Sequence, residues 1–447
     1  MGTQFLKNSN FSDQYDVNFS RRNNSKKDYG DTSSIVVVGA SHAGISFVDK
    51  VRKNGFRGSL TLIDRQKGGP MQRPPLSKGF LLETSEKPNS KYLLKTSKWY
   101  KDEKVFLHTN VTVSKIDLRK KRLTFNNGKN LDYGKLVLAT GAAPRMLPAA
   151  QGIANVFVLR QPDQAMAIRK IAHSARNAII IGGGYIGLEI AATFRQIGLE
   201  VSVVEVADRL LARVASPPVA ELLAGLHQER GVVLYTGNGV EEVFQNNGLF
   251  SGVKLTDGTN LIGDILVVGI GVTPDSDLAL RAGIETETTT GGAVLVDEYQ
   301  LTSDPDVFAI GDVAFQRGSP LRLESIHNAQ ESGVRAAAAI MGKPLPAVQA
   351  PWFWSDQYDA NLQSVGILPM GDRNVYQVIR GEFPEKRASF WSYRDNKLLA
   401  VEAVRDGESF MLGKKCLEEN ISPDPSLISD LGFDPMAWIL KNSARAE

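Results

Sequence analysis

Cysteine is almost absent from this chain of 447 residues, in which Cys416 is the only one. A single thiol excludes an intrachain disulfide, a Cys-X-X-Cys redox pair and a Cys₄ iron–sulfur site. Cys416 is far along the chain from the two glycine-containing turns that begin at Gly39 and Gly182, so we interpret it as structural. The histidines show no metal-ligand spacing, and we expect no metal site among His42, His108, His173, His227 and His327.

The chain also lacks a long apolar run and a charge excess of either sign. No uncharged apolar run approaches 18 residues, so no spanning helix is expected. The formal net charge of +3 is too small to argue for nucleic-acid or membrane binding. Residues 1–33 are rich in Asn, Ser and Lys without a secretory-type apolar core, which predicts a disordered tail. We expect a cytoplasmic protein.

Glycine, by contrast, is abundant, and two glycine-containing stretches look alike. Residues 35–44 and 178–187 each begin as a β-branched apolar run and continue through a Gly turn into helical spacing. Each is followed by a second apolar strand ending in an acid, Asp64 or Glu205, which fall 20 and 18 residues after the last glycine of the turn. This pattern is one βαβ unit present twice. It predicts an α/β fold with two Rossmann-like dinucleotide-binding domains.

The Gly turns carry the chemistry of pyrophosphate binding, which needs backbone N–H groups at close range and the positive end of a helix dipole. The second turn matches the G-x-G-x-x-G pattern fully, with Gly182, Gly184 and Gly187. The first has Gly39 and Gly44 but Ser41 at the middle position, where a small side chain hampers close approach without forbidding it. The alternative for either turn is a Gly-rich strand–helix connection without a ligand.

The terminal acids are predicted to accept hydrogen bonds from the ribose hydroxyls of the adenosine. A carboxylate at Glu205 also repels the 2′-phosphate of NADPH, which favours NADH. Arg209 and Arg213 follow closely and could accommodate that phosphate, but we interpret them as ordinary helix residues.

Two further strands end in short polar segments. Residues 135–141 form an apolar run ending in Thr140 and Gly141, and residues 307–312 form another ending in Asp312. Because ligands of open α/β sheets gather outside the carboxyl ends of the strands, these segments are candidates for cofactor contact. The alternative is a pair of plain turns with a solvated aspartate.

The order of these motifs resembles the FAD-dependent NADH:ferredoxin reductase family, which includes the rubredoxin and putidaredoxin reductases that serve P450 or Rieske oxygenase systems. The resemblance runs from about Ile35 almost to the C-terminus. Its most specific stretches are Arg73 to Lys78, Gly187-Leu188-Glu189, Gly269 to Pro274, Glu324-Ser325-Ile326 and the Pro-Trp-Phe-Trp-Ser-Asp-Gln run that begins at Pro351.

The resemblance implies three domains beyond the tail. An FAD-binding domain, discontinuous in sequence, comprises residues 34–150 and 274–345. An NADH-binding domain comprises residues 151–273, and a C-terminal α+β reductase domain comprises residues 346–447.

The resemblance also implies roles for individual residues. Lys78 is expected beside the flavin ring, paired with Glu189, so that these two are the candidate catalytic residues. Further candidates for cofactor contact lie in the Gly turns, the strand ends and the family motifs: Gly39, Ser41, Ala43, Gly44, Asp64, Arg73, Val111, Thr140, Gly141, Arg160, Gly182, Gly184, Gly187, Glu205, Gly271, Asp312 and Ile326.

Hydride transfer from NADH to FAD requires no nucleophile or metal, and the electrons must then leave the flavin. Without a dithiol they are expected to pass singly to an external carrier, which the family implies is a small 2Fe–2S ferredoxin, or a rubredoxin. Lys414 and Lys415 are candidates for its docking, but more simply they are solvated. Two alternatives remain: an NADH dehydrogenase that reduces quinone, and a non-catalytic NADH-binding sensor of the same fold.

Overall fold

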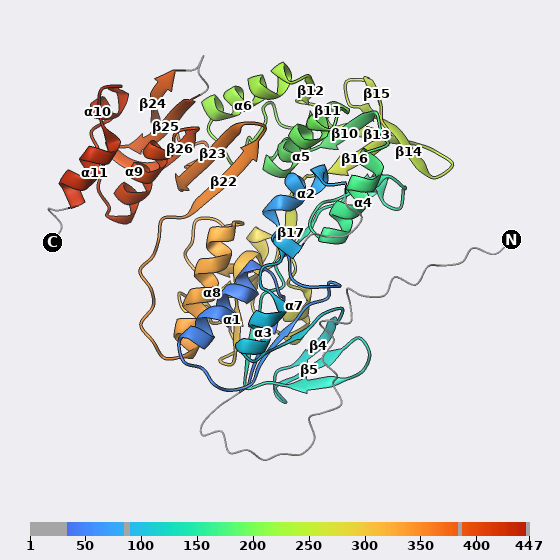
Figure 1. The fold of residues 1–447 in the computed structure, drawn as a ribbon, viewed down its shortest axis with the longest axis vertical. Helices are drawn as coiled ribbons and strands as arrows, with labels where there is room; N and C mark the ends of the chain where they lie inside the picture. Colours follow the sequence, from blue (N-terminus) through green and yellow to red (C-terminus); the bar gives the residue numbers. More distant parts are fainter. Residues whose placement is uncertain (1–33, 85–89, 383–386, 444–447) are drawn as a thin grey trace. The chain divides into compact units, whose positions relative to one another are not determined.

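The computed structural model describes residues 34–84, 90–382 and 387–443, so the predicted tail lies outside the described residues. Contacts divide the chain into two units (Figure 1). The first unit comprises Met1–Gln72, Lys87–Ala143 and Val272–Ala347. The second unit comprises Arg73–Glu86, Pro144–Gly271 and Val348–Glu447.

The first unit is built on a parallel sheet with the strand order β20-β7-β1-β2-β3. The bounds of these strands are β1 Ile35–Val38, β2 Leu60–Ile63, β3 Val105–His108, β7 Lys135–Leu138 and β20 Val307–Ala309. The register aligns Val38 with Ile63 and with Leu138, and Leu138 with Ala309. The residues that follow all five strands therefore lie at one edge of the sheet. This edge includes the two polar segments that follow β7 and β20.

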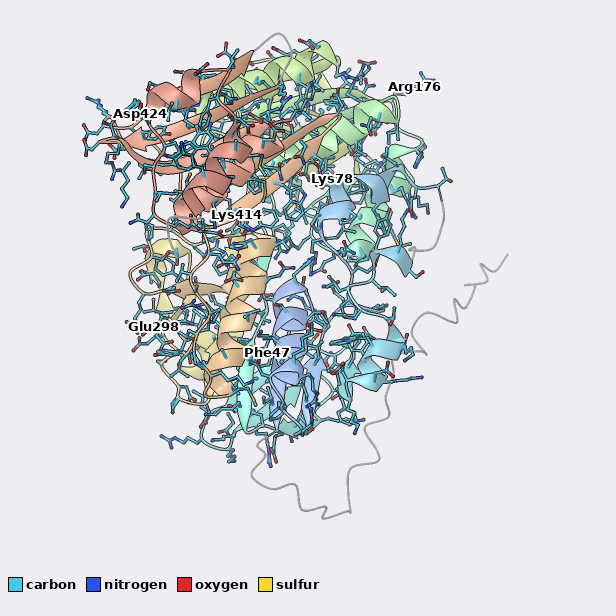
Figure 2. All side chains as sticks on the ribbon, turned by 60° about the vertical axis from the view of Figure 1, so that its left-hand side comes forward. Phe47, Lys78, Arg176, Glu298, Lys414 and Asp424 are labelled. Carbon is cyan, nitrogen blue, oxygen red and sulfur yellow. The ribbon has the colours of Figure 1, made fainter. Side chains whose placement is uncertain are left out.

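Two helices pack side by side in the first unit, α1 (His42–Lys53) and α8 (Ile326–Ile340) (Figures 1 and 2). The apolar face of α1 includes Phe47, Val48 and Val51, which are fully buried at helical spacing. The helices approach closely because α8 carries Gly333, where a Cβ would lie 2.8 Å from the carbonyl oxygen of Ala43.

The second unit repeats this arrangement with the parallel order β12-β11-β10-β16-β9. The strands are β9 Val156–Phe157, β10 Asn177–Ile181, β11 Glu200–Glu205, β12 Val232–Thr236 and β16 Ile265–Val268. Helix α5 (Tyr185–Gln196) connects β10 to β11, as α1 connects β1 to β2. The repeat predicted from the two Gly turns is therefore confirmed.

The repeat extends further than the sequence indicated, because each parallel sheet has its own three-stranded antiparallel sheet inserted in the chain, between β3 and β7 in the first unit and between β12 and β16 in the second. In the first unit these strands are β4 Val113–Asp117, β5 Arg122–Phe125 and β6 Asn130–Asp132. In the second unit they are β13 Val240–Asn246, β14 Leu249–Leu255 and β15 Asn260–Ile262.

The second unit also contains an antiparallel sheet with the order β22-β23-β26-β25-β24. Its strands are β22 Trp352–Gln357, β23 Ala360–Gly366, β24 Tyr376–Glu382, β25 Arg387–Arg394 and β26 Lys397–Val404. Helix α9 (Gly407–Glu418) packs on it, and Cys416 is fully buried in this core beside Trp391 and Leu412. Burial raises the pKa of the Cys416 thiol to about 12, so the prediction of a structural cysteine is confirmed.

The remaining elements are further helices, 3₁₀ turns and strands. The helices are α2 Gly79–Leu82, α3 Ser97–Asp102, α4 Pro162–Ala172, α6 Pro217–Glu229, α7 Asp277–Ala282, α10 Pro425–Ser429 and α11 Pro435–Ser443. The 3₁₀ turns are η2 Pro74–Ser77, η3 Ser90–Tyr92, η4 Pro148–Ala150, η5 Thr288–Thr290 and η6 Gly311–Val313. The remaining strands are β8 Ala142–Pro144, β17 Val272–Pro274, β18 Thr286–Glu287, β19 Ala293–Val296 and β21 Ala314–Gln316. The α/β fold class is confirmed, and the four domain boundaries stay predictions.

Candidate functional site

The second Gly turn shows which of its glycines the fold itself requires. A Cβ at Gly182, where φ is +108°, would lie 2.4 Å from the carbonyl oxygen of Gly269. A Cβ at Gly187 would lie 2.1 Å from the carbonyl oxygen of Gly182, whereas a Cβ at Gly184 would meet nothing within 4 Å. The outer glycines are therefore needed for packing, and the middle one borders open space that suits a ligand.

The first Gly turn has the same steric pattern. A Cβ at Gly39, where φ is +112°, would lie 2.0 Å from the carbonyl oxygen of Ala139, and a Cβ at Gly44 would lie 2.1 Å from that of Gly39. Ser41 occupies the middle position, in an extended conformation that any residue adopts. Ser41 corresponds to Gly184 of the second turn, where a Cβ would meet no protein atom within 4 Å. A serine at this position therefore does not disturb the packing of the turn.

Both turns lead into helices whose N-termini suit an anion. Ser41 is the N-cap of α1 and Gly184 that of α5, and neither residue makes a side-chain capping hydrogen bond. Neither helix has an acidic residue in its first turn. The first turn of each helix thus brings no negative charge of its own to the N-terminus, and the Gly turns fit a dinucleotide pyrophosphate.

The two terminal acids make equivalent hydrogen bonds. Asp64 accepts from the backbone N–H of Ala40 at 3.0 Å and of Gln66 at 2.8 Å. Glu205 accepts from the N–H of Gly183 at 2.7 Å and of Ala207 at 2.8 Å. In each unit the carboxylate is held against the second residue of the Gly turn. Both acids are thereby fixed beside the turns, where the adenosine ribose was predicted.

Other predicted FAD residues also meet at the edge of the first sheet. Val111 donates its backbone N–H to the carbonyl oxygen of Asp64 at 3.0 Å. The Thr140 hydroxyl donates to the carbonyl oxygen of Asp275 at 2.7 Å, and the Asp275 N–H donates to that of Gly141 at 2.9 Å.

Asp312 is brought to the same edge by its neighbour Gly311. With φ at +71°, Gly311 packs so closely on α1 that a Cβ there would lie 2.9 Å from the Cβ of Ala43. Its N–H donates to the Ser332 hydroxyl at 2.9 Å. Ile326 is the first residue of α8. Ala43, Asp312 and Ile326 thus belong to the two helices and the turn that pack together.

Besides the second Gly turn, Glu205 and Lys78, three further predicted cofactor residues lie in the second unit. Arg73 donates its guanidinium N–H to the carbonyl oxygen of Arg160, which follows β9. The Arg160 N–H donates to Gln164 Oε1 at 2.8 Å. Gly271 has φ at +105° and follows β16, the strand next to β10.

The interpretation of Arg209 and Arg213 as helix residues is wrong. Both lie in the turns between β11 and α6, where the chain returns from the sheet edge before the helix begins at Pro217. Arg209 donates to the carbonyl oxygens of Leu210 and Ala212 at 3.2 Å each, so its guanidinium stabilises its own turn.

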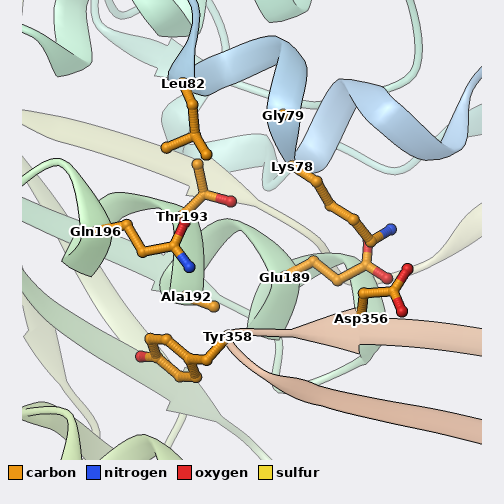
Figure 3. Close-up of a pocket in the computed structure, with 9 residues that line it drawn as sticks. All are labelled: Lys78, Gly79, Leu82, Glu189, Ala192, Thr193, Gln196, Asp356 and Tyr358. Atoms are coloured by element: carbon orange, nitrogen blue, oxygen red, sulfur yellow. The ribbon is translucent and has the colours of Figure 1, made fainter.

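The candidate catalytic residues form an ion pair within the second unit. Lys78 Nζ lies 2.8 Å from Glu189 Oε2, and the Glu189 side chain is only 3% exposed. Figure 3 shows the charged ends of Lys78, Glu189 and Asp356 together at one end of a pocket of about 170 Å³. The remaining lining residues are Gly79, Leu82, Ala192, Thr193, Gln196 and Tyr358.

Sequence reasoning missed the neutral groups around Glu189. The Ser77 hydroxyl donates to Glu189 Oε2 at 2.5 Å, and the Ser355 hydroxyl donates to Oε1 at 2.7 Å. Behind Ser355 lie Gln357 and His227, whose side chains are 1% and 0% exposed. Ser355 and Gln357 belong to the Trp-rich motif that begins at Pro351, and this motif could have indicated their importance. Nothing in the sequence pointed to His227.

The aromatic residues of this motif contribute to packing. The Trp352 ring centroid lies 5.5 Å from that of Trp354 and 6.0 Å from that of Phe410. The Phe353 ring centroid lies 4.5 Å from that of Tyr185, the first residue of α5. The docking candidates Lys414, labelled in Figure 2, and Lys415 pair with acids one helical turn away, Glu418 and Glu419. Their role in docking stays a prediction.

Two dinucleotide folds, each with a Gly turn that leads into a helix without an acidic residue in its first turn, fit an oxidoreductase that uses FAD and NAD(H). The comparisons with known proteins agree. Residues 33–333 match the pyridine nucleotide-disulphide oxidoreductase family, and residues 352–437 match the reductase C-terminal family. The chain belongs to this oxidoreductase family, and within it to the ferredoxin reductases that its motifs resemble.

The relatives cover nearly the whole chain. It is 33% identical over 406 residues to rhodocoxin reductase of Rhodococcus erythropolis, covering 90% of this chain and 93% of that one. A solved ferredoxin reductase for the CYP199A2 system from Rhodopseudomonas palustris is 36% identical with a TM-score of 0.86, covering 91% of this chain and all of that one. The reductase in a covalent putidaredoxin reductase–putidaredoxin complex is 32% identical with a TM-score of 0.86, covering 93% and 99%.

Within residues 34–84, 90–382 and 387–443, no cluster of His, Cys, Asp and Glu could hold a metal ion. Over the same ranges, no helix combines the length and apolarity needed to cross a bilayer.

Proposed function

We propose that this protein is an NADH:ferredoxin reductase that delivers single electrons to a 2Fe–2S ferredoxin, which in turn supplies an oxygenase of the P450 or Rieske type. The observation that carries the proposal is its similarity over nine-tenths of its length to a reductase of a P450 system and to one joined to its putidaredoxin. The alternative electron acceptor in this proposal is a rubredoxin.

The reaction balances without any further group. When bound, FAD would supply the redox chemistry, taking a hydride from NADH and passing its electrons on one at a time. Each NADH yields NAD⁺, one proton and two electrons, so two ferredoxins are reduced per NADH. A dithiol has no part in it, since Cys416, the only cysteine, is buried with a raised pKa.

In the first unit, the turn from Gly39 to Gly44 would hold the FAD pyrophosphate at the α1 N-terminus, with Asp64 at the ribose. The hydrogen bonds from Ala40 and Gln66 keep that carboxylate in place. Ala43, Val111, Thr140, Gly141, Asp312 and Ile326 would line the same site. Their convergence at one sheet edge supports this assignment.

In the second unit, the turn from Gly182 to Gly187 would hold NADH, with Glu205 at the ribose and Gly271 beside the coenzyme. Arg73 and Arg160 would contact FAD. Lys78 would favour the electron-rich reduced flavin through its positive charge, and Glu189 would hold Lys78 in position. The 2.8 Å ion pair supports these two roles.

The proposal also includes a cytoplasmic location, which cell fractionation would test. It also includes three domains: an FAD-binding domain of residues 34–150 and 274–345, an NADH-binding domain of residues 151–273 and a C-terminal domain of residues 346–447. Limited proteolysis would test these boundaries.

The decisive experiment has two parts. First, the visible spectrum of the purified protein is recorded before and after NADH, and we expect a flavin band that NADH bleaches. Second, cytochrome c reduction is followed with and without an added 2Fe–2S ferredoxin, and we expect turnover only with it. Turnover with quinone but not ferredoxin would establish an NADH dehydrogenase. NADH binding without turnover by any acceptor would establish a sensor.

A further inference from the structure

The carboxylate of Glu189 is surrounded by donors on both oxygens. Oε2 accepts from Lys78 Nζ and from the Ser77 hydroxyl, and Oε1 accepts from the Ser355 hydroxyl at 2.7 Å. A serine hydroxyl has one proton, and Ser355 donates it in the hydrogen bond to the carboxylate. The Ser355 oxygen is therefore left as an acceptor, so its next partner must be a donor.

That donor is the Gln357 amide, whose Nε2 lies 3.2 Å from the Ser355 hydroxyl oxygen. With its nitrogen turned to Ser355, Gln357 presents Oε1 to His227 Nε2 at 2.9 Å. An amide oxygen only accepts, so the proton between them belongs to His227 Nε2. The chain thus runs in one sense, from His227 through Gln357 and Ser355 to Glu189.

The far end of the chain is consistent with this direction. Burial lowers the pKa of His227 to about 4, so its ring is neutral at pH 7 with a single N–H, the one on Nε2. Nδ1 is then an acceptor, and the Tyr358 hydroxyl lies 3.5 Å from it. Tyr358 borders the pocket that Lys78 and Glu189 also line (Figure 3).

We propose that Gln357 and His227 are positioning residues for the proposed hydride transfer, acting through Ser355 to hold the Glu189 carboxylate and, through it, the Lys78 ammonium. The inference rests on the proposed roles of Lys78 and Glu189. A carboxylate turns freely about its last bond unless donors fix it from both sides, and here the fixed donor on Oε1 is Ser355. Hydrogen bonds aligned in one sense polarise one another, which strengthens the last bond to the carboxylate.

The sequence of neutral groups suits this task. Gln357 has both the donor and the acceptor that the chain requires at that place, and it brings no charge that would compete with Lys78 for Glu189. The side chains of Ser355, Gln357 and His227 are 0%, 1% and 0% exposed, so water does not replace any of these bonds. The chain joins α6 to α5 through β22.

The test is a double-mutant cycle on flavin reduction by NADH, measured by stopped flow on the holoprotein. We expect Gln357→Leu to slow reduction about tenfold, equivalent to about 1.4 kcal/mol. In a Glu189→Gln background, adding Gln357→Leu should change the rate by less than about twofold, since the two substitutions act on one group. Equal tenfold losses in both backgrounds, or a wild-type rate in the single variant, would overturn the inference.

The cycle separates this inference from the function beneath it. If Glu189→Gln alone reduces flavin at the wild-type rate, the proposed roles of Lys78 and Glu189 fail. If Glu189→Gln is slow but Gln357→Leu is not, only the positioning chain fails. Should Gln357→Leu not fold, Ser355→Ala takes its place in the same cycle with the same expected outcome.

A matched control addresses general damage to the sheet. Ser389 on β25 is a fully buried serine that accepts from Trp391 Nε1 at 3.0 Å and has no part in the chain. Ser389→Ala should leave flavin reduction at the wild-type rate. A loss as large as that of Ser355→Ala would mean that sheet packing, rather than the chain, sets the rate.

A spectroscopic readout tests the direction of the chain independently of turnover. In the ¹⁵N spectrum of histidine-labelled holoprotein, the His227 signals are identified by their absence in His227→Gln. We expect the Nε2–H tautomer at pH 7, and a mixture of tautomers in Gln357→Leu. An Nδ1–H tautomer in the wild-type protein would reverse the chain and overturn the proposal.

Discussion

Lys78 Nζ lies 2.8 Å from Glu189 Oε2, in an ion pair whose acidic partner is almost completely buried. A charge this poorly hydrated is stable only while its donors remain, and removal of one partner leaves it uncompensated. The pair therefore holds the Lys78 ammonium in one place. This is the property that a residue needs to act electrostatically on a bound cofactor.

We expect Lys78→Met to slow flavin reduction by NADH roughly tenfold or more, because the variant keeps the apolar stem and loses the charge. The measurement is the stopped-flow rate at saturating NADH. Lys98→Met is the control, since Lys98 pairs with Asp102 in a largely exposed ion pair. Equal rates for Lys78→Met and the wild-type protein would remove Lys78 from the catalytic site.

The two kinds of glycine in the second turn should respond oppositely to alanine. Gly184→Ala meets no protein atom within 4 Å, so we expect an unchanged melting temperature and a higher KM for NADH. Gly187→Ala would bring Cβ to 2.1 Å from the carbonyl oxygen of Gly182, so we expect a loss of roughly 1–3 kcal/mol or more in the free energy of unfolding. Calorimetry and steady-state kinetics measure both. An unchanged KM in Gly184→Ala would argue against NADH at this turn.

Glu205 should set the preference for NADH. We expect the wild-type ratio of kcat/KM for NADH over NADPH to fall roughly tenfold in Glu205→Gln, because the repulsion of a 2′-phosphate is lost. Glutamine retains one acceptor for the Gly183 N–H, so the turn survives. Glu241→Gln, at an exposed acid paired with Lys254, should leave the ratio unchanged. Equal use of both coenzymes by the wild-type protein would contradict the assignment.

His227 should make stability depend on pH. Its folded-state pKa of about 4 lies below the ordinary 6.5, so between these values the unfolded chain binds a proton that the folded one does not. Stability is therefore fully present above pH 6.5 and is lost as the pH falls towards 4. At pH 5 the loss amounts to about 2 kcal/mol.

We expect His227→Gln to lose that much less stability than the wild-type protein between pH 7.5 and pH 5, measured by urea unfolding of the holoprotein. The difference between the two proteins cancels the contributions of other groups. His173→Gln, at an exposed histidine that ends α4, should keep the wild-type dependence. An identical pH dependence in His227→Gln would show that the ring is not held neutral.

Much of the cofactor architecture follows from local sequence features. A β-branched run, a Gly turn and a helix recur twice because each βαβ unit needs them within one short segment. The polar ends of β7 and β20 were predicted at one edge because parallel strands share their carboxyl ends, and the register of Leu138 with Ala309 confirms it. The helical assignment of Arg209 and Arg213 failed because their segment turns back on itself instead.

What the sequence determined by itself was the pair of dinucleotide folds, since turn chemistry and strand periodicity act between near neighbours. Only the tertiary structure decided which side chains surround the Glu189 carboxylate. Ser77, Ser355, Gln357 and His227 come from η2, β22 and α6, and none has a spacing that relates it to α5. Burial made their hydrogen bonds obligatory, because a carboxylate removed from water must find its donors wherever folding brings them.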